Sequence, residues 1–455
     1  MSTDPATPPR GLAALDVLVP GSPGWDDARR AWNLTVDQQP DAVFMPANAA
    51  EVAAAVPAAG AAGLRVAVQA TGHGAGPRRN LEGTLLINTS RMRGASVDPA
   101  SRTARAEAGA QWRDVVPLAA EHGLAALHGT APDVGVVGYT LGGGVSWLGR
   151  RYGLAANSVT AIEVVTAAGE AVRADADTEP DLFWALRGGG GNFGVVTALE
   201  FRLYPVESLN AGWLVWPWEE ARRVLARWAE WTDTVPEDVT SVGRILQLPP
   251  LPDLPEAFRG RKLVVVDAAI LADEDEAARL LAPLRELGPE LDTFAQGPAT
   301  ALSELHMDPP EPVPAAAAGS VIDAFPPEAV DALVDVAGPG SGSPLAAVEL
   351  RHIGGALERA PAGAGALGRI DGRFLVFAAG IVTSPEGAPA VADAGARANA
   401  ALSRWGAGRA FLNFADVPTD TETMFDPQAY RRLREIRSRI DPDGLLLANH
   451  PIPAA

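Results

Sequence analysis

Residues 71–76 combine the residue types that a phosphate-bearing ligand and a reactive imidazole would need. The segment reads Thr71-Gly72-His73-Gly74-Ala75-Gly76 and follows an apolar run at 64–70 that is typical of a strand. Glycine permits positive φ and lets the backbone approach a ligand closely. We therefore expect a loop with bare backbone N–H groups that can bind phosphate, with the imidazole of His73 presented outward.

Two further glycine-rich stretches lie at 135–144 and 188–194. The second contains G-x-G-x-x-G, but these glycines follow a predicted helix and precede a predicted strand, the reverse of a dinucleotide-binding Rossmann unit, so a tight turn is the alternative. Gly142–Gly144 precede Val145–Leu148, which we expect to open a helix whose N-terminus faces phosphate. Three such loops in one half of a chain suggest a large cofactor that carries phosphate.

The composition excludes several classes of protein. Among the 455 residues there are 37 Lys and Arg and 56 Asp and Glu, a net charge of −19, which argues against nucleic-acid binding. The chain has no cysteine, which excludes disulfides, thiolate metal sites and a catalytic thiol. No signal-like or membrane-length apolar run and no metal-ligand spacing of His, Asp and Glu is visible, so we expect a cytoplasmic protein with no membrane or metal partner.

Hydrophobic periodicity predicts an α+β fold. In the first half we expect helices at 49–62, 111–122 and 181–187, and strands at 42–46, 64–70, 84–88, 95–97, 103–108, 159–166, 171–174 and 195–203. In the second half we expect helices at 218–232, 274–287 and 389–405, strands at 241–247, 262–271, 345–353 and 373–383, and loops at 308–318 and 360–367. A last helix should begin with Asp426 as N-cap and Pro427 at its first position. The second half thus predicts a mostly antiparallel sheet with helices on one face.

At its glycine loops the chain resembles the vanillyl-alcohol-oxidase/p-cresol-methylhydroxylase (PCMH-type) flavoproteins, in the berberine-bridge-enzyme-like branch. The motifs that carry the resemblance occur in order: Gly72-His73, Pro132-Asp133-Val134-Gly135, Leu141-Gly142-Gly143-Gly144, Arg150-Arg151-Tyr152-Gly153-Leu154, Asp181 to Gly190, and Asn192-Phe193-Gly194-Val195-Val196-Thr197. The resemblance covers about 42–206 and resumes at Asn413 and at 440–452.

The resemblance implies FAD as cofactor and a division of the chain into three parts. These are an FAD-binding domain at 1–206 with a PCMH-type core at about 36–206, a substrate-binding domain at 207–410, and a segment at 411–455 that returns to the FAD domain. It also implies a covalent bond between FAD and His73. The implied cofactor-binding residues are Thr71, Gly72, His73, Gly74 and Ala75, then Ala131, Pro132, Asp133, Val134, Gly135, Gly138, Tyr139, Gly142, Gly143 and Gly144, then Gly194, Val195 and Val196, and finally Asn413 and Asn449.

Three departures from the family pattern affect the expected chemistry. Many relatives attach the flavin a second time through a cysteine at the place of Ala131, and this chain has none. Many have a catalytic tyrosine where this chain has Phe411, in Phe411-Leu412-Asn413, and plant relatives often have a glutamate base on the strand that matches 373–381, where this chain has no carboxylate. The usual proton acceptors of the family are therefore missing.

Tyr139, Glu349 and Arg351 are the remaining candidates for catalytic residues. Alternation along the predicted strand places Glu349 and Arg351 on one face and His352 on the other. An exposed Glu–Arg pair and a packed tyrosine are the alternatives to a catalytic role. His128 and Asp133 flank the second loop, and His306 beside a proline-rich stretch is interpreted as a loop histidine.

The sequence therefore predicts an FAD-dependent oxidase that takes a hydride from a hydroxylated small molecule, a sugar or a secondary metabolite, to flavin N5. In the branch that it resembles, valine at the place of Val134 is associated with oxygen access, so molecular oxygen is the expected acceptor. The alternatives are a flavin-fold cyclase or binding protein without net redox turnover, and a dehydrogenase that uses another acceptor.

Overall fold

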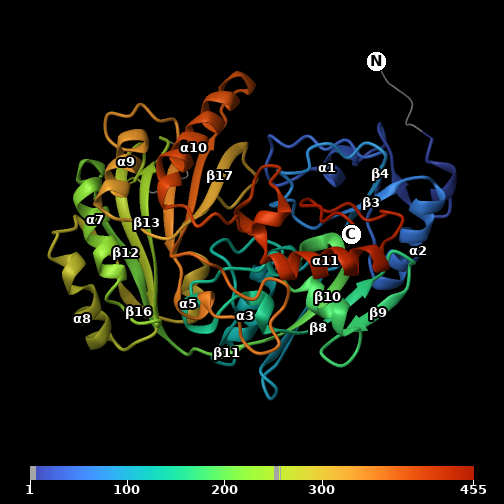
Figure 1. Cartoon of the computed structure of the whole chain (residues 1–455), viewed down its shortest axis with the longest axis horizontal. Coiled ribbons are helices and arrows are strands. Elements are labelled where there is room, and N and C mark those ends of the chain that lie inside the picture. Colours follow the sequence, from blue (N-terminus) through green and yellow to red (C-terminus); the bar gives the residue numbers. More distant parts are fainter. Residues whose placement is uncertain (1–6, 251–255, 257) are drawn as a thin grey trace.

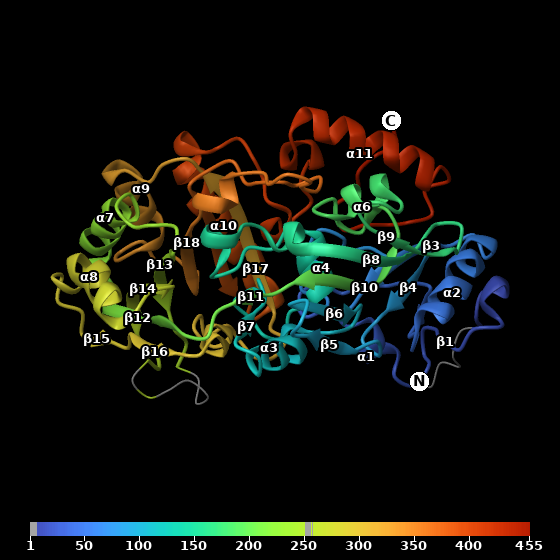
Figure 2. The same cartoon turned by 90° about the horizontal axis from the view of Figure 1, so that it is seen from below.

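The computed structural model describes residues 7–250, 256 and 258–455, and its strands form three main sheets and one two-stranded ribbon (Figure 1). The first two sheets lie in one half of the molecule and the third fills the other half. The C-terminal helix α11 (Pro427–Ile440) lies against the first half, where it packs on α6 (Pro180–Leu186) (Figure 2). None of the helices that the structure describes has the length and hydrophobicity of a transmembrane span.

The first sheet has four strands in the order β1-β2-β4-β3 and carries the His73 loop at the end of β3. Its strands are β1 (Val17–Leu18), β2 (Ala42–Phe44), β3 (Arg65–Gln69) and β4 (Thr84–Asn88). β2 and β4 are fully buried, as strands covered on both faces should be. The helices α1 (Trp25–Arg29) and α2 (Ala49–Ala61) pack on it, and α2 begins where the side chain of Asn48 accepts the Glu51 N–H.

The second sheet has five antiparallel strands in the order β5-β6-β10-β8-β9. They are β5 (Ala95–Asp98), β6 (Thr103–Glu107), β8 (Val159–Val165), β9 (Ala171–Ala174) and β10 (Val195–Arg202). The short helices α4 (Val136–Leu141) and α5 (Gly149–Tyr152) and the helix α3 (Trp112–Ala120) fill the space between this sheet and the other half. β7 (Leu124–Ala125) and β11 (Tyr204–Pro205) form the two-stranded ribbon, and the chain passes from β11 into the third sheet.

The third sheet is antiparallel, with the strand order β15-β12-β14-β13-β18-β19-β17 and β16 paired to β12. Its strands are β12 (Leu209–Pro217), β13 (Val239–Gln247), β14 (Lys262–Ile270), β15 (Leu291–Asp292), β16 (Ala295–Gly297), β17 (Ala315–Ile322), β18 (Ala347–His352) and β19 (Phe374–Ile381). One face is covered by the helices α7 (Ala221–Thr232), α8 (Glu274–Arg285), α9 (Pro327–Ala337) and α10 (Ala388–Leu402).

The opposite face of the third sheet is directed toward the first half. Its apolar part includes Trp213, Val242 and Val265, which pack with Trp147 and Leu148 of the first half. Short 3-10 helices connect the elements at Arg10–Leu12, Ala155–Ser158, Gly190–Asn192, Trp218–Glu220, Ala299–Ser303, Gly355–Glu358, Pro385–Gly387, Ser403–Trp405, Leu412–Phe414 and Thr421–Met424. The predicted α+β class and the antiparallel sheet with helices on one face are confirmed.

The structure corrects three expectations about local elements. The predicted loop at 308–318 is wrong from Ala315 onward, because β17 begins there and pairs with β19 along its length. Val145–Leu148 do not form the first turn of a helix: α4 ends with Gly142 as its C-terminal cap, and the next helix, α5, begins only at Gly149 after Leu148 as its N-cap. β12 and α9 were not predicted at all.

Candidate active site

The glycines of the first loop have two different environments. Gly72 has φ +82°, and a Cβ there would lie 2.7 Å from the Ala31 Cα, so only glycine lets the two segments meet. A Cβ on Gly74 would meet only the Asn449 amide, at 3.7 Å. In the described part of the chain, the N–H groups of Gly72, His73 and Gly74 have no protein acceptor. The loop therefore presents free donors on its open side.

His73 is held by three side chains. The Thr71 Oγ1 lies 2.7 Å from its Nδ1, and the Asp133 Oδ2 lies 3.4 Å from its Nε2. The indole of Trp32 stacks on the imidazole with 4.6 Å between ring centroids and donates Nε1–H to the same Asp133 oxygen at 2.7 Å. Burial raises the pKa of Asp133, but its contacts with His73 and Trp32 outweigh burial and lower the pKa below its ordinary value.

The loop at 131–135 runs along the start of α3, which fixes the position of Asp133. The backbone N–H of Trp112 donates to the Val134 carbonyl at 3.1 Å, and that of Arg113 donates to the Pro132 carbonyl at 2.8 Å. Ala131 and Gly135 close the same loop: the Val134 N–H donates to the Ala131 carbonyl, and Gly135 pairs with Gln111. These bonds hold the loop in a position that places the carboxylate of Asp133 beside His73.

Asn413 ties the second glycine loop to the C-terminal segment. Its Oδ1 accepts the Gly144 N–H at 2.9 Å, and its Nδ2 donates to the Tyr139 carbonyl at 3.1 Å. A Cβ on Gly143 would lie 2.9 Å from Leu367 and 3.0 Å from Phe411. Glycine is therefore required at 142–144 by protein packing, whereas no atom lies within 4 Å of the Cβ position of Gly138.

The third loop, at 188–194, anchors the end of the chain. The Asn192 side chain donates to the carbonyls of Gly189 and His450, and it accepts the Ile452 N–H at 2.9 Å. A Cβ on Gly194 would meet the side chain of Val164 on β8, and Val195 and Val196 continue directly into buried β10. The tight-turn alternative thus has a packing reason in the structure. The side chain of Asn449 donates to the Gly74 carbonyl at 2.5 Å, so this segment also reaches the first loop.

Tyr139 lies between the second loop and the core. Its hydroxyl donates to the Leu127 carbonyl at 3.1 Å, and its ring meets that of Trp112 edge-on with centroids 5.4 Å apart. Burial raises the pKa of Tyr139 strongly, and the charge of Arg351 opposes this only in part. A hydroxyl that already donates to a carbonyl and has a raised pKa is a poor proton acceptor, so the geometry favours the packed alternative for Tyr139.

Glu349 and Arg351 lie on the face of the third sheet that is directed toward the first half. Arg351 donates to the Glu349 Oε2 from Nε at 3.2 Å and from Nη2 at 3.0 Å. Glu349 is only 5% exposed, so the alternative of an exposed pair is wrong. His352 points to the other face, where it packs 5.8 Å from the Phe374 ring, as the alternation predicted.

His306 extends this pair into the interior of the sheet face. Its Nε2 lies 3.0 Å from the Glu349 Oε1, and its Nδ1 lies 3.0 Å from the Asp267 Oδ2. Arg244 completes the arrangement, with Nη2 2.9 Å from the same Asp267 oxygen. We call Arg244, Asp267, His306, Glu349 and Arg351 the charge row. His306 does sit in a loop, as predicted, but it is 1% exposed and bound at both ring nitrogens.

The charges within the row set one another's protonation. Burial and Arg244 lower the pKa of His306, but Glu349 and Asp308 outweigh them and raise it above its ordinary value. Burial raises the pKa of Glu349, but His306 and Arg351 outweigh it and lower that pKa strongly. Both directions favour an imidazolium beside a carboxylate.

Two contacts bring the charge row to the second glycine loop. The Arg351 guanidinium lies 5.0 Å from the ring centroid of Phe414, the neighbour of Asn413. Thr130, at the start of the 131–135 loop, donates to the Asp308 Oδ2 at 2.6 Å, and the other Asp308 oxygen is 3.9 Å from the His306 Nε2. The predicted residues of the two halves therefore meet at one place, although no direct contact joins His73 to the row in the described chain.

Sequence reasoning missed Trp32, Asp267 and His306. They lie on three separate segments, and only the fold brings them to the predicted residues. The available signal was Asp267, a lone carboxylate inside the apolar strand β14, because an ionised side chain is rarely buried without a partner.

The remaining buried histidines belong to the core. His128 lies 2.7 Å through Nδ1 from the Gly129 carbonyl, and burial lowers its pKa to about 4. Burial also lowers the pKa of His352, and it lowers that of His450 to about 4. No cluster of three potential metal ligands occurs among the residues that the structure describes.

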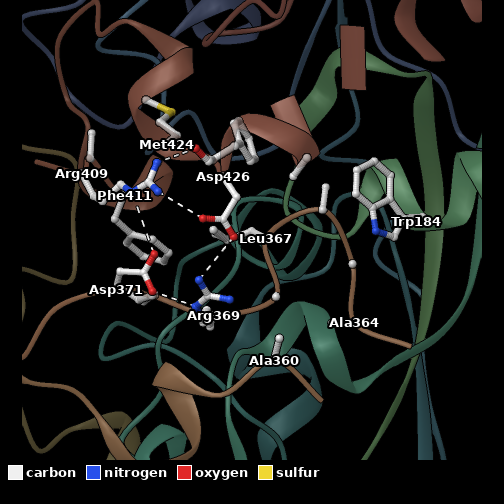
Figure 3. A pocket seen from close by; sticks show the side chains of 17 residues that line it. Trp184, Ala360, Ala364, Leu367, Arg369, Asp371, Arg409, Phe411, Met424 and Asp426 are labelled. Atoms are coloured by element: carbon white, nitrogen blue, oxygen red, sulfur yellow. Dashed lines mark hydrogen bonds and ion pairs between the residues drawn. The ribbon is translucent and has the colours of Figure 1, made fainter. Parts of the chain in front are cut away.

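A cavity of about 260 Å³ lies elsewhere, between α6, the segment at 360–371 and the segment at 409–429 (Figure 3). Its polar wall is a ring of ion pairs in which Arg369 and Arg409 each contact both Asp371 and Asp426, at 2.7 to 3.9 Å. None of the predicted site residues lines it. The cavity is therefore distinct from the candidate active site.

Comparison with known proteins identifies the cofactor domain. The family described as FAD binding domain matches residues 40–175. The (R)-6-hydroxynicotine oxidase of Paenarthrobacter nicotinovorans is 35% identical over 202 residues, 44% of this chain and 44% of that protein. The chain thus matches about half the length of its curated relatives.

Solved structures show the same fold over nearly the whole chain. The 6-hydroxy-D-nicotine oxidase from Arthrobacter nicotinovorans superposes with a TM-score of 0.85 at 25% identity, covering 98% of this chain and 99% of that one. A glucooligosaccharide oxidase from Acremonium strictum has a TM-score of 0.82 at 22% identity, covers 97% of this chain and 98% of its own, and is described with a 6-S-cysteinyl, 8α-N1-histidyl FAD.

The residues present fit FAD. Its diphosphate needs several converging N–H donors, and the first loop supplies three that lack a protein acceptor, beside the open faces of Gly74 and Gly138. Three buried polar atoms of the region also make no hydrogen bond to protein within the described residues: His73 Nε2, Asp133 Oδ1 and Thr140 Oγ1. Buried polar atoms are normally paired, so this set suits a large polar ligand.

Proposed function

We propose that this chain, which carries a PCMH-type FAD-binding domain within the fold shared by FAD-linked oxidases, is an FAD-dependent oxidase of hydroxylated small molecules. The observation that carries the proposal is the buried Glu349–Arg351 pair beside the second glycine loop. A carboxylate and a guanidinium in that position can accept and orient a hydroxyl group at a flavin. The names of the relatives, oxidases of a hydroxynicotine and of oligosaccharides, support the reaction class.

FAD would be held by the first loop and by the 131–138 segment. Asn449 fixes the first loop through its hydrogen bond to the Gly74 carbonyl. Bound FAD supplies a two-electron acceptor that takes a hydride at N5. A covalent bond to His73 forms part of the proposal, because the imidazole is stacked on Trp32, hydrogen-bonded at Nδ1 and 3.4 Å from Asp133 at Nε2, in a loop otherwise open to the ligand. With no cysteine in the chain, this would be the single link.

Arg351 and Glu349 divide the work on the substrate hydroxyl. Arg351 uses Nε and Nη2 for Glu349, which leaves its Nη1 without a protein partner among the described residues and free to bind the substrate oxygen. Glu349 is ionised and close by, so it can accept a hydrogen bond from the hydroxyl group and receive its proton during the reaction. The ring of Phe414 borders this place, with the Arg351 guanidinium 5.0 Å from its centroid.

Anaerobic flavin reduction in a stopped-flow spectrometer tests the function. The probes are the oligosaccharides maltotriose and xylobiose, in which one carbon carries both the hydrogen and the hydroxyl group that the reaction needs, added to the FAD-loaded protein. We expect one of them to bleach the flavin and Glu349→Gln to slow the bleaching by roughly 10²–10⁴-fold, the usual effect of removing an acid–base group. Glu435→Gln on the exposed side of α11 is the matched control and should behave as wild type.

The outcomes separate the alternatives. Failure of hydroxylated substrates to reduce the flavin would support a cyclase or binding protein without redox turnover. Fast reduction followed by slow reoxidation in air would indicate a dehydrogenase with another acceptor. The three domain limits and the cytoplasmic location stay predictions.

A further inference from the structure

His306 lies at the centre of the charge row, which is more elaborate than a single substrate-binding pair requires. The row alternates in charge, Arg244, Asp267, His306, Glu349 and Arg351, and comes from three strands and one loop. The Arg351 side chain is 14% exposed, whereas Glu349, His306, Asp267 and Arg244 are all buried, at 5% or less. One end is therefore open to the site and the other closed.

Burial of such a row is costly, because each charge loses its hydration and must be compensated by neighbours. If Glu349 and Arg351 only had to bind a hydroxyl, an apolar residue in place of His306 would leave their own ion pair intact. His306 instead uses both ring nitrogens, Nε2 toward Glu349 and Nδ1 toward Asp267, each at 3.0 Å. An imidazole between two carboxylates is an arrangement that can hold a proton.

We propose that the proton lost by the substrate hydroxyl passes through Glu349 to His306, so that the proton acceptor is the Glu349–His306 pair. This rests on the proposed function. In the step, the substrate C–H bond breaks with hydride transfer to bound FAD, and the O–H proton goes to Glu349. Glu349 returns to the carboxylate by passing that proton to the His306 Nε2. The substrate becomes a carbonyl compound and FAD is reduced by two electrons.

The geometry makes the imidazolium the stable end state of this step. Among the described residues, the charged groups that face His306 are Arg244 on β13, Asp267 on β14, Glu349 and Arg351 on β18, and Asp308 on its own loop. Three are anions and two are cations, and the two shortest contacts are to carboxylates. Glu349 alone, ionised and flanked by Arg351, would be a weak base, and neutral His306 behind it supplies the missing proton affinity.

The sign of the pH dependence follows. Only neutral His306 can take the proton, so the rate of flavin reduction should rise with pH and level off above the pKa of His306. That pKa lies above the ordinary value of 6.5, because Glu349 and Asp308 outweigh burial and Arg244. Replacing the partly exposed Asp308 by Asn removes one anion that stabilises the imidazolium, so it should lower the pKa of His306. The substitution keeps the side-chain size and leaves no cavity.

Histidine NMR on the FAD-loaded protein tests the proposal without any substrate. The chain has six histidines, and His306→Gln assigns the signal of His306 by its loss. We expect this signal to titrate above pH 6.5 in the wild type and at lower pH in Asp308→Asn and Glu349→Gln. His122→Gln, at an exposed position, is the matched control and should leave it unchanged. Titration at or below 6.5, or no response to Asp308→Asn, would overturn the proposal.

Kinetics with the probe that bleaches the wild-type flavin provide the second readout. The wild-type rate should rise through the NMR-determined pKa. His306→Gln should lose that rise and run at least about tenfold slower at high pH. Wild-type pH dependence in His306→Gln would refute the relay and leave the oxidase proposal intact. Absence of flavin reduction in the wild type would refute the oxidase proposal, and the NMR titration would then decide alone whether His306 holds the proton.

Discussion

The two ring nitrogens of His73 have different neighbours, a hydroxyl at Nδ1 and the carboxylate of Asp133 at Nε2. Asp133 keeps its negative charge there, since its pKa is lowered overall, and so it can accept a hydrogen bond from Nε2–H. With the proton held on Nε2, the lone pair of Nδ1 is available as the nucleophile toward the cofactor.

We therefore predict that acid precipitation leaves flavin on the wild-type protein and releases it from His73→Ala. Mass spectrometry of a digest should place flavin only on the peptide that contains His73. Flavin in the acid supernatant of the wild type would contradict the covalent bond, and flavin on another peptide would contradict the single link.

Val134 lies between Asp133 and Gly135 and is partly buried against the core of the first half. A larger side chain there should narrow the path of oxygen to the flavin. We predict fast reoxidation of the photoreduced wild type in air and slower reoxidation of Val134→Leu, with an unchanged rate in Val68→Leu, which lies on an exposed face of β3. Equal reoxidation rates for Val134→Leu and wild type would show that Val134 does not line the path of oxygen to the flavin.

Single residues were predictable where a local motif marks them. His73 lies among glycines and Glu349–Arg351 share a strand face, and both patterns are visible within a few positions. His306 is 43 residues from Glu349 and 39 from Asp267, so no local pattern joins them. A proton relay built across strands is decided by sheet register, which only the fold supplies.

Asp416 shows how one segment constrains another. It packs against the first loop so closely that a Cβ on Gly76 would lie 2.9 Å from its Oδ1. Burial raises the pKa of Asp416 to about 6, and Arg79 opposes this only in part. The folded chain therefore holds this proton more tightly than the unfolded chain does, which contributes stability at low pH that is lost as pH rises through about 6.

Asp416→Asn should remove this pH-dependent loss of folding stability, because asparagine does not ionise. We predict that the variant is more stable than wild type at pH 8 by roughly 1–2 kcal/mol, and not at pH 4, where both side chains are neutral. Urea unfolding of the FAD-loaded protein at the two pH values measures this difference. Asp443→Asn, on an exposed turn, is the control and should show no such difference. A variant that is equally stable relative to wild type at both pH values would show that Asp416 is ionised in the fold.

Helices and strands were predictable where their ends carry a chemical signal or their pattern is unbroken. α11 begins at Pro427 after Asp426, as expected, and β4 has the predicted bounds Thr84–Asn88. β17 was missed because its alanines and glycine have no strand preference of their own, and pairing with β19 decides its conformation. Part of the fold thus depends on partners distant in sequence.

Arg150 joins the two halves of the molecule. It lies on α5, is buried, and donates to the carbonyls of Val239 and Ile353 at 2.7 and 2.6 Å and of Pro236 at 3.5 Å. Burial lowers its pKa to about 10, so it stays charged at neutral pH. Its three acceptors all belong to the second half.

Arg150→Met should leave these carbonyls unpaired and cost about 2–4 kcal/mol of unfolding free energy, since each unsatisfied buried group costs roughly 1–3 kcal/mol. Arg151→Met is the matched control. Arg151 is about half exposed and only 3.4 Å from Asp238, so its loss should change stability by less than about 0.5 kcal/mol. Chemical unfolding of both variants measures the difference, and equal stabilities would show that the halves are held together elsewhere.

The return of the chain to its first half has a consequence for the order of events in the cell. Leu446 pairs with Val66 beside β3, and Ile452 bonds to Asn192. A ribosome makes the first half before the second, and domains generally fold in the order of their synthesis. Here the residues that finish the half with the His73 loop emerge after all strands of the third sheet. The nascent chain must therefore synthesise the third-sheet half before the half with the His73 loop can close.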